Sequence, residues 1–325
     1  MDEQLRIVVA GASGIGKHHA KWWHQISDCE VVGFLGSSEA SCVATEQSLR
    51  ELFGFAGKGY WNMEQLLAEE RPHVVDMCIP NEQHFDCTLQ ALEAGAHVLC
   101  EKPLVWHEGE TPQRLLERSR ILVDKATNAG LHLGICTQYA AALPQYLQLY
   151  ESIRGPLESI STFYAEMETG TRGRQRDAAE VWVDMGPHPL TLLLRWMPHG
   201  HIVPSSLQKE FVGSEARIVC DFVAGQRNCH SEIIVRDLQE GKPARRFGVN
   251  DFIVDSTGRN DVDGIYHSVL QWEDREVVGK DFMALLIARF ADAVKGFEAQ
   301  PLVTGETGLR NLELQLQFTP GAAWW

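Results

Sequence analysis

Near its amino terminus the chain has an apolar run, Leu5 to Ala10, that leads into a glycine-rich turn, Gly11 to Gly16, and then into a helix-forming stretch, Lys17 to Trp23. This order predicts a strand, a tight turn and a helix. Glycines let the backbone approach a ligand closely, and a helix N-terminus offers N–H groups to an anion, so the turn suits a pyrophosphate. A tight turn between strand and helix also needs glycine for steric reasons. The turn alone therefore leaves a structural and a binding interpretation open.

The spacing within the turn is close to that of a dinucleotide-binding fingerprint. Anchoring G-x-G-x-x-G on Gly11 and Gly16 places Ser13 at the middle glycine, with Gly14 one position late. Serine is small enough for this position, and its hydroxyl can donate to a phosphate. The candidate cofactor contacts in the turn are Gly11, Ser13, Gly14, Ile15 and Gly16.

The end of the second predicted strand, Cys29 to Leu35, bears on the choice of dinucleotide. A fold that prefers NAD normally has an acidic residue here to bind the ribose. This chain has Gly36, followed by Ser37 and Ser38, whose hydroxyls suit a 2′-phosphate. No arginine lies beside the two serines, and Lys58 is a remote candidate for that role. We expect NADP(H) rather than NAD(H), with Ser37 and Ser38 as contacts.

Two further apolar runs, Val74 to Ile79 and His97 to Cys100, indicate buried strands. The second ends in Glu101-Lys102-Pro103, where the proline keeps Lys102 out of a following helix. In a parallel sheet these ends face the crevice in which ligands bind. His84 is interpreted equally well as a helix-capping residue or as a ligand contact. The candidate contacts at these two strand ends are Pro80, Asn81, His84, Glu101 and Lys102.

With 325 residues and 44% hydrophobic content, the chain is long enough for two domains. From Gly155 onward, β-forming segments such as Leu157 to Tyr164 and Ala216 to Val223 follow one another with few helices between them. This pattern predicts a largely antiparallel sheet that is open on one face. We expect α/β architecture in residues 1–127 and an α+β domain in residues 128–325.

Charge and composition limit the kinds of partner that we expect the protein to bind. The chain has 29 basic and 44 acidic residues, a net charge of −15, which argues against nucleic acid or an anionic membrane. No apolar run reaches the ~20 residues that span a bilayer, and no signal peptide is recognisable. The eight cysteines include no C-x-x-C pair, which indicates reduced core thiols and no metal site. We therefore expect a cytoplasmic protein.

Asp184 and His188 are four residues apart, and on a single helix they would share a face. A carboxylate beside an imidazole fixes its tautomer and raises its basicity. Taken alone, Asp184 is more simply explained as the N-cap of a helix whose first turn contains Pro187. A glycine-rich turn and a lysine at a strand end in the same chain favour the catalytic interpretation.

Taken together, these motifs resemble the Gfo/Idh/MocA family of oxidoreductases, which includes glucose–fructose oxidoreductase and inositol dehydrogenase. The order and spacing match over nearly the whole chain. The matching segments are Gly11 to Gly16 with His19-Ala20, Pro80-Asn81 with His84, Glu101-Lys102-Pro103, Asp184-x-Gly186-x-His188, and Phe282 to Val303 with Pro301-Leu302-Val303-Thr304-Gly305-Glu306-x-Gly308.

The resemblance implies a Rossmann domain with a doubly wound parallel sheet, a C-terminal α+β domain with a large open sheet, and an NAD(P)-dependent oxidoreductase. The implied reaction is hydride transfer between nicotinamide and a carbon of a sugar, cyclitol or related polyhydroxy compound. Lys102, Asp184 and His188 are the implied catalytic residues, brought together between the two domains. His188 oriented by Asp184 suits proton transfer, and Lys102 suits either charge stabilisation or the proton transfer itself.

Substrate contacts are less defined than the reaction. Thr191 replaces a residue that is often acidic in the family, and Ala178-Ala179-Glu180 replaces a glycine-rich segment. An arginine cluster upstream of Asp184 suits an anionic substrate group, although a solvated loop explains it as well. Aromatic residues suit the wall of a sugar site or, equally, a core. The residues concerned are Arg172, Arg174, Arg176, Tyr139, Tyr164 and Trp182.

Two other functions fit the same motifs. One is a non-catalytic sensor of nucleotide and sugar, which would have no need of a proton-transfer set. The other is a reductase of a C=O or C=N group in a compound that is not a sugar. An open sheet face also predicts a homo-oligomer, either a dimer or a tetramer.

Overall fold

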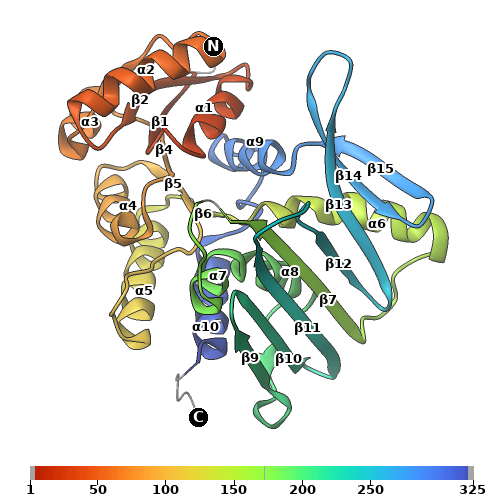
Figure 1. Cartoon of the computed structure of the whole chain (residues 1–325). Coiled ribbons are helices and arrows are strands. Elements are labelled where there is room, and N and C mark those ends of the chain that lie inside the picture. The colour runs from red at the N-terminus through yellow and green to blue at the C-terminus, as the bar shows by residue number, and fades with distance from the viewer. Residues whose placement is uncertain (1–3, 172, 321–325) are drawn as a thin grey trace. The chain divides into compact units, whose positions relative to one another are not determined.

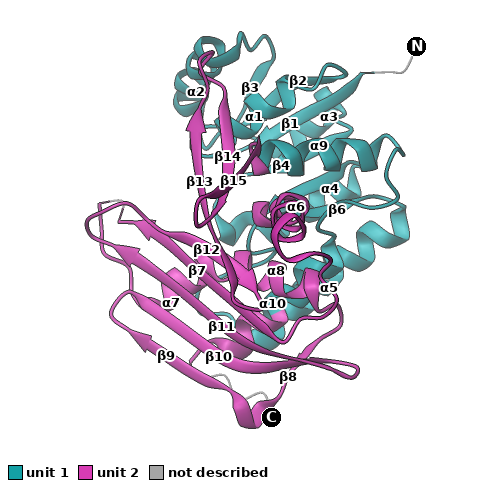
Figure 2. Cartoon of the chain, turned by 90° about the vertical axis from the view of Figure 1, so that its right-hand side faces the viewer, with its two compact units in different colours: residues 1–136, 283–312 teal, residues 137–282, 313–325 magenta. Residues whose placement is uncertain are grey.

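The structure is a computed structural model that describes residues 4–171 and 173–320. The chain divides into two compact units, residues 1–136 with 283–312 and residues 137–282 with 313–325 (Figure 2). The expected division at residue 127 differs from this partition in two ways. The first unit continues through the strand that ends at Cys136, and a later segment returns to it. The return follows from packing, since Phe290 of that segment lies against Trp23 and Gly134 of the first unit.

Unit 1 is built on a six-stranded parallel sheet in the order β3-β2-β1-β4-β5-β6 (Figure 1). Its strands are β1 (Leu5–Ala10), β2 (Cys29–Leu35), β3 (Lys58–Tyr60), β4 (Val74–Met77), β5 (His97–Glu101) and β6 (Leu133–Cys136). Its helices are α1 (Gly16–His24), α2 (Glu39–Phe53), α3 (Met63–Glu70), η1 (Asn81–Gln83), α4 (His84–Glu93), α5 (Pro112–Ala129) and most of α9 (Phe282–Val294). The order is that of a Rossmann fold, which confirms the expected doubly wound sheet.

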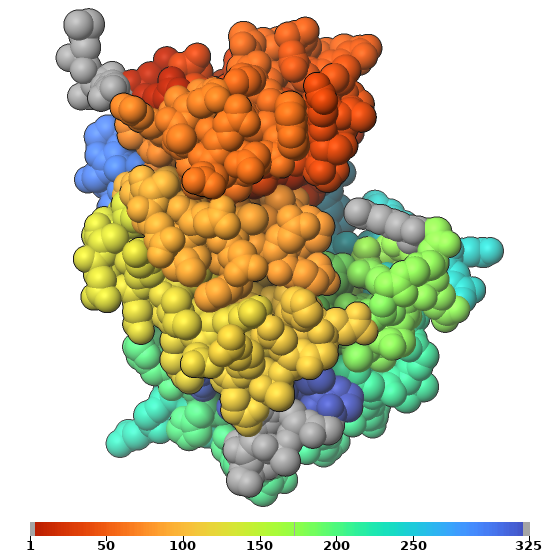
Figure 3. Space-filling model, turned by 90° about the vertical axis from the view of Figure 1, so that its left-hand side faces the viewer, coloured from red at the N-terminus to blue at the C-terminus, as the bar shows by residue number. Residues whose placement is uncertain are grey.

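Local sequence explains where these elements begin and end. Thr111 caps α5 through its side-chain oxygen, Pro112 occupies the first turn, and Gly130 ends the helix with a φ of 66°. The central strands β1, β4 and β5 are almost entirely buried because helices cover both faces of a parallel sheet. On the side shown in Figure 3, helices α4 and α5 form the light orange and yellow surface of unit 1.

Unit 2 is built on a nine-stranded, mostly antiparallel sheet, as expected. The path is β15-β14-β13-β12-β7-β11-β10-β8, with β9 paired to β10. Among the strand pairs of this sheet in the described residues, only β7 and β11 run parallel. Its strands are β7 (Thr162–Gly170), β8 (His201–Ile202), β9 (Gln208–Val212), β10 (Glu215–Ala224), β11 (Arg227–Leu238), β12 (Arg245–Val249), β13 (Phe252–Asn260), β14 (Tyr266–Trp272) and β15 (Arg275–Lys280). Its helices are η2 (Gln138–Ala142), α6 (Leu143–Arg154), α7 (Ala178–Met185), α8 (Pro187–Trp196), η3 (Pro204–Ser206) and the end of α10 (Gly305–Phe318).

The two faces of this sheet differ in chemistry. Helices α6, α7 and α8 pack on one face, where β11 contributes Ile233 and Val235. The other face carries ion pairs centred on three arginines: Arg236 contacts glutamates of β7 and β10, Arg246 contacts Glu166 and Asp255, and Arg217 contacts Glu210 and Glu232. Strand alternation separates the faces, since consecutive side chains point in opposite directions.

None of the helices in residues 4–171 and 173–320 is long and apolar enough to cross a bilayer. The eight cysteines are free thiols, and most of them are buried.

Candidate functional site

The carboxyl ends of β1, β4 and β5 meet at one edge of the parallel sheet of unit 1. Their register pairs Ala10 with Met77 and Met77 with Cys100, so the segments that follow lie next to one another. The strand order reverses between β1 and β4, and ligands of open α/β sheets bind at such a switch point. The glycine-rich turn and Lys102 therefore lie along the same edge of the sheet.

The turn has a shape that only glycine permits at two positions. Gly11 has a φ of 85°, and a Cβ atom there would lie 2.5 Å from the carbonyl oxygen of Cys78. A Cβ atom on Gly16 would overlap the carbonyl of Gly11. At Gly14, by contrast, a Cβ atom would meet nothing within 4 Å, and Ser13 and Ile15 beside it are exposed. This part of the turn faces open space, as a ligand-binding turn requires.

Helix α1 begins at this turn without a capping side chain, and its first turn contains no acidic residue. No carboxylate at the start of this helix therefore competes with an anion for the helix N-terminus. This arrangement fits a pyrophosphate.

At the end of β2, where a ribose would bind, Gly36 is tightly packed, and this explains why the position has no carboxylate. A Cβ atom at Gly36 would lie 2.7 Å from the sulfur of Cys42, so a larger residue there would displace the Cys42 side chain. The hydroxyl oxygen of Ser38 accepts the Ser41 N–H and caps α2. The hydroxyl of Ser37 donates to that of Ser41 at 3.2 Å. Both serines are exposed, and the first turn of α2 also holds the exposed Glu39.

Glu101, Lys102 and Pro103 follow β5 as expected, and hydrogen bonds fix their backbone. The Lys102 N–H donates to Glu101 Oε2 at 3.3 Å, and the Lys102–Pro103 peptide is cis. The carbonyl of Pro103 lies 2.9 Å from Nδ1 of His84. Lys102 itself is partly exposed, whereas Pro103 is buried.

The side chain of His84 does not cap α4, whose N-cap residue is Gln83. The His84 side chain is fully buried, and its second ring nitrogen lies 3.0 Å from the carbonyl of Ile79. Burial lowers the pKa of His84. Burial and these two contacts argue against the predicted cofactor contact, because His84 holds two loop carbonyls. Pro80 and Asn81 do lie on the accessible side, with Pro80 exposed and Asn81 partly so.

A buried polar group behind this edge was not predicted from the sequence. Asp76 of β4 and His19 of α1 are both fully buried, and His19 Nδ1 lies 2.9 Å from Asp76 Oδ2. Trp23 Nε1 donates to the same oxygen at 2.7 Å, and His19 Nε2 lies 3.4 Å from Glu101 Oε1. The available signal was an aspartate inside an otherwise apolar strand, which requires a partner when it is buried.

The same region brings His19, Asp76 and Cys136 close enough that their ligand-type atoms lie within 4.8 Å of one another. Metal binding needs a thiolate and a free imidazole nitrogen. Burial raises the pKa of Cys136 well above its usual value, and His19 Nδ1 is bonded to Asp76. The three residues fit a hydrogen-bonded network better than a metal site.

In unit 2, Asp184 and His188 lie on two consecutive helices rather than on one. Helix α7 ends at Met185 and α8 begins at Pro187, which has no N–H to continue the first helix. A Cβ atom on Gly186 between them would lie 2.6 Å from the Trp182 carbonyl, so the junction needs glycine. Asp184 is not an N-cap either, because Asp177 caps α7.

Arg176 holds the carboxylate of Asp184. Its Nη1 donates to Asp184 Oδ2 at 2.7 Å, while Nε and Nη2 donate to the two oxygens of Asp237 at 2.8 and 2.7 Å. The Asp237 side chain is 1% exposed, so this fork is anchored in the protein. Hydrogen bonds to both carboxylates raise the pKa of Arg176, which stays charged.

His188 is nearly buried, and its ring makes an edge-on contact with Tyr139 at a centroid distance of 5.4 Å. Burial raises the pKa of Tyr139, so the phenol stays neutral. Tyr139 also packs against Phe247 of the sheet. Tyr139, one of the three aromatic residues predicted as substrate walls, thus contacts His188.

The other predicted substrate residues lie elsewhere. Trp182 is fully buried against Phe318 and donates to the carbonyl of Gln315, so it is a core residue. Tyr164 is on the ion-paired face of the sheet, because its register partner is Glu232, whereas α8 packs on the opposite face of β7. Arg174 pairs with Glu180 at the surface. The prediction for Arg172 falls on a residue outside the described ranges.

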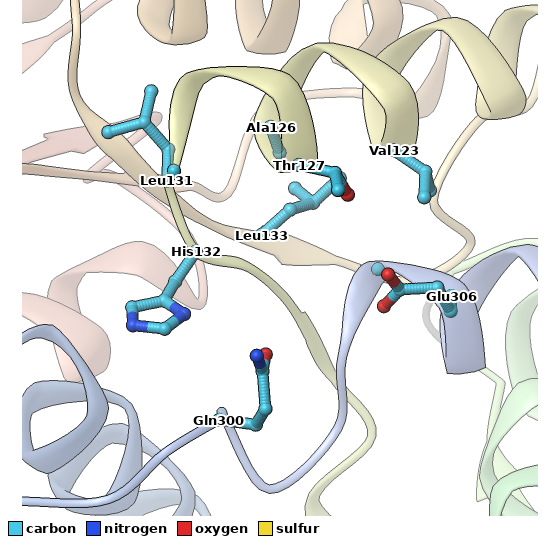
Figure 4. A pocket seen from close by; sticks show the side chains of 10 residues that line it. Val123, Ala126, Thr127, Leu131, His132, Leu133, Gln300 and Glu306 are labelled. Atoms are coloured by element: carbon cyan, nitrogen blue, oxygen red, sulfur yellow. The ribbon is translucent and has the colours of Figure 1, made fainter.

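Two cavities of unit 1 lie at the amino-terminal edge of its sheet, away from the crevice. One, of about 210 Å³, lies between the end of α5 and the start of α10, with His132, Gln300 and Glu306 in its wall (Figure 4). The other is lined by residues that precede β4 and β5, including His73 and His97. Neither contains a residue of the predicted site.

The strand order and the glycine turn at the switch point define unit 1 as a dinucleotide-binding Rossmann domain. Residues 5–124 match the model of a family described as "Oxidoreductase family, NAD-binding Rossmann fold". The match lies within unit 1, so residues 5–124 are similar to the NAD-binding domain of the Gfo/Idh/MocA oxidoreductases.

Individual relatives are sugar dehydrogenases by name. D-glucoside 3-dehydrogenase of Escherichia coli is 35% identical over 141 residues, which are 43% of this chain and 36% of that protein. D-xylose 1-dehydrogenase (NADP(+)) of Hypocrea jecorina is 24% identical over 220 residues, 59% of this chain and 54% of that protein. The aligned stretches thus span about a third and about half of these relatives.

The fold of the whole chain is that of a solved structure. UDP-N-acetylglucosamine 3-dehydrogenase from Acidithiobacillus ferrooxidans superimposes with a TM-score of 0.73 over 97% of this chain and 96% of that chain, at 20% identity. The likeness extends to both units and shows the fold alone.

Proposed function

We propose that this protein is an NAD(P)-dependent dehydrogenase or reductase that transfers a hydride between nicotinamide and a CH–OH carbon of a sugar, cyclitol or related polyhydroxy compound. The observation that carries the proposal is the position of Lys102. It follows β5 at the switch point of a Rossmann sheet, on the edge that also holds the glycine-rich turn. The names of the relatives support the substrate class.

The proposed mechanism needs one group to move the hydroxyl proton and another to stabilise the charge that develops on the oxygen. The nicotinamide, when bound, accepts or supplies the hydride. Lys102 holds the substrate oxygen as a compact cation, and His188 moves the proton, oriented by Asp184. Lys102 is equally able to move the proton if the substrate site is dry. We propose Lys102, Asp184 and His188 as the catalytic residues.

Arg176 has a different role from the one expected for it. Its guanidinium is bonded to Asp184 and Asp237, and Arg174 is paired with Glu180. We therefore assign Arg176 to holding Asp184 and not to binding an anionic substrate. A neutral polyhydroxy compound fits this arrangement better than a sugar acid.

Replacing Lys102 by Ala tests the catalytic assignment. We expect turnover to fall by ~10²–10³-fold, as for removal of a group that stabilises a developing oxyanion, with the dissociation constant of the reduced cofactor changed by less than about threefold. Lys125→Ala, which replaces a partly exposed lysine of α5, is the matched control. The assay is a panel of sugars, glucosides and cyclitols with both cofactors, read at 340 nm.

Three outcomes of this panel contradict the proposal. Full turnover of Lys102→Ala refutes the assigned site. Activity on an imine or a simple ketone with none on any polyol indicates a reductase of a non-sugar substrate. Tight binding of cofactor and a sugar without any turnover indicates a sensor.

We propose NADP(H) as the preferred cofactor. Gly36 is tightly packed and carries no carboxylate, and Ser37 and Ser38 present hydroxyls at the same edge. Fluorescence titration should show tighter binding of NADPH than of NADH, and clearly tighter NADH refutes the preference. Ser37→Asp should weaken NADPH at least tenfold, because a carboxylate repels the 2′-phosphate, and should affect NADH far less.

We also propose a cytoplasmic homo-oligomer. Free thiols throughout the chain suit a reducing compartment. The face of the second sheet that lies opposite α7 and α8 offers a broad surface for a copy of the chain. Sedimentation at micromolar concentration tests the assembly, and a monomer contradicts it.

A further inference from the structure

Three fully buried side chains lie behind Glu101-Lys102-Pro103 and take no part in the proposed chemistry. They are His19, Trp23 and Asp76, and each is 0% exposed. Asp76 Oδ2 accepts from both His19 Nδ1 and Trp23 Nε1, at 2.9 and 2.7 Å, and Asp76 Oδ1 accepts from the Cys78 thiol at 3.6 Å. The carboxylate of Asp76 is therefore fixed by three neighbours, and it fixes His19 in turn.

His19 stands between two carboxylates. Its Nε2 faces Glu101 Oε1 at 3.4 Å, on the side opposite Asp76. A protonated imidazole carries an N–H toward both acceptors, whereas a neutral one donates from a single nitrogen. Burial by itself lowers the pKa of His19, but the charges and hydrogen bonds of Asp76 and Glu101 outweigh it and raise the pKa to about 10. At neutral pH His19 is a buried cation.

Glu101 transmits this arrangement to Lys102. One of its oxygens faces His19, and the other accepts the backbone N–H of Lys102 at 3.3 Å. On the far side of Lys102, the carbonyl of Pro103 is held by His84 at 2.9 Å. The backbone of Lys102 is thus fixed both before and after the residue.

Burying charges here calls for an explanation other than stability. A buried ion pair costs several kcal/mol of desolvation for each ion, and apolar residues of similar volume often stabilise a fold as well or better. What the charges provide is a defined geometry: two short hydrogen bonds, at 2.9 and 2.7 Å, fix the carboxylate of Asp76, and a longer ionic contact of 3.4 Å joins His19 to Glu101. The chain of contacts runs from β4 through α1 to the end of β5, and α1 begins at the glycine-rich turn.

We propose that His19 is a positioning residue for Lys102: Asp76 and Trp23 hold His19, His19 holds the carboxylate of Glu101, and Glu101 holds the backbone of Lys102. The side chain of His19 joins helix α1, which begins at the cofactor turn, to strand β5, which leads to Lys102. The inference rests on the proposed function of Lys102 for its catalytic consequence, and on the contacts of unit 1 for its geometry.

The first test compares His19→Gln with His18→Gln, which replaces the exposed neighbour on the same helix. A misplacement of about 1 Å costs on the order of 10²-fold in rate, so we expect kcat of His19→Gln to fall ~10–100-fold. The dissociation constant of NADPH should change by less than about threefold, and His18→Gln should match the wild type. An unchanged kcat in His19→Gln overturns the proposal, as does an equal loss in both variants.

The second test asks whether His19 acts through Glu101. If it does, Glu101→Gln alone and the double variant should have the same kcat, because the second change removes a contact that is already lost. If the loss in the double variant equals the product of the two single losses, the residues act independently and the proposal is wrong.

Nuclear magnetic resonance supplies two readouts that need no substrate, and the first of them uses the wild-type protein alone. In the wild type, both ring nitrogens of His19 should carry protons at pH 7 to 8, and a neutral tautomer there overturns the proposal. The backbone amide resonance of Lys102 should shift in His19→Gln and stay in place in His18→Gln. If no compound supports hydride transfer, the proposed function fails while these signals still decide the positioning.

Discussion

Replacing Arg176 by Met gives the sharpest test of the second half of the site. The Asp237 side chain is 1% exposed and takes both of its charged hydrogen bonds from Arg176, at 2.7 and 2.8 Å. Removing one partner of a buried ion pair costs about 3–5 kcal/mol, because the other charge is left in a medium of low polarity. The Arg176 side chain is 22% exposed, so water compensates for part of the loss. We expect a cost of about 3 kcal/mol.

A second variant tests whether the loss of stability in Arg176→Met comes from the unpaired charge of Asp237. Arg176→Met combined with Asp237→Leu removes both charges, and an apolar pair of similar volume is often neutral. The double variant should therefore be within about 1 kcal/mol of the wild type. Arg174→Met is the matched control, since Arg174 pairs at the surface with Glu180 and should leave the urea midpoint unchanged.

Urea unfolding of the cofactor-free protein, followed by tryptophan fluorescence, measures these differences. Turnover should fall in Arg176→Met as well, because Asp184 loses the donor at 2.7 Å that holds its carboxylate. A cost below about 1 kcal/mol for Arg176→Met, or a double variant as unstable as the single one, refutes the reasoning.

Three further predictions concern unit 1 and the core of unit 2. Gly11→Ala should weaken NADPH binding at least tenfold, because its Cβ atom would lie 2.5 Å from the Cys78 carbonyl at a φ of 85°; an unchanged dissociation constant by fluorescence contradicts this. Burial and neighbouring histidines lower the pKa of His97 from 6.5 to about 4. As the pH falls, His97 therefore takes up its proton in the unfolded chain before it does so in the folded one. The free energy of unfolding should fall by about 2 kcal/mol between pH 6.5 and 4, after allowance for the partial exposure of His97. In urea titrations, His97→Asn should reduce this dependence on pH. Tyr146→Phe should lower the free energy of unfolding by about 2–3 kcal/mol, because the buried hydroxyl donates to the Phe252 carbonyl at 2.9 Å and accepts the Val249 N–H at 3.0 Å. A loss below about 0.5 kcal/mol in urea unfolding would show that water replaces the hydroxyl.

The sequence alone determined the features that depend on neighbouring residues. Alternating apolar runs and helix signals predict the parallel sheet, and the glycines at positions 11 and 16 mark the turn because few other residues fit its backbone. The place of Lys102 follows from a strand ended by proline. Each of these features depends only on residues that are close together in the sequence.

The pairing of distant residues was decided by the tertiary structure. Asp76 is 57 residues from His19, and Asp237 is 61 residues from Arg176. No periodicity connects such positions, so the sequence showed a charge in an apolar strand without showing its partner. The arginine cluster looked equally suited to a substrate anion, and only the fold shows that Asp184 and Asp237 already occupy Arg176.

The same physical reason accounts for the misplaced aromatic residues. Tyr164 and Phe163 are adjacent in β7, yet strand alternation puts one on the ion-paired face and the other in the core. Sequence predicts that neighbours point to opposite sides but not which side the helices will cover. Trp182 is likewise suited to a sugar wall or to a core, and packing against Phe318 made it part of the core. Local sequence thus set the elements and the cofactor turn, while burial and long-range contacts decided which polar side chains hold Lys102 and Asp184 in place.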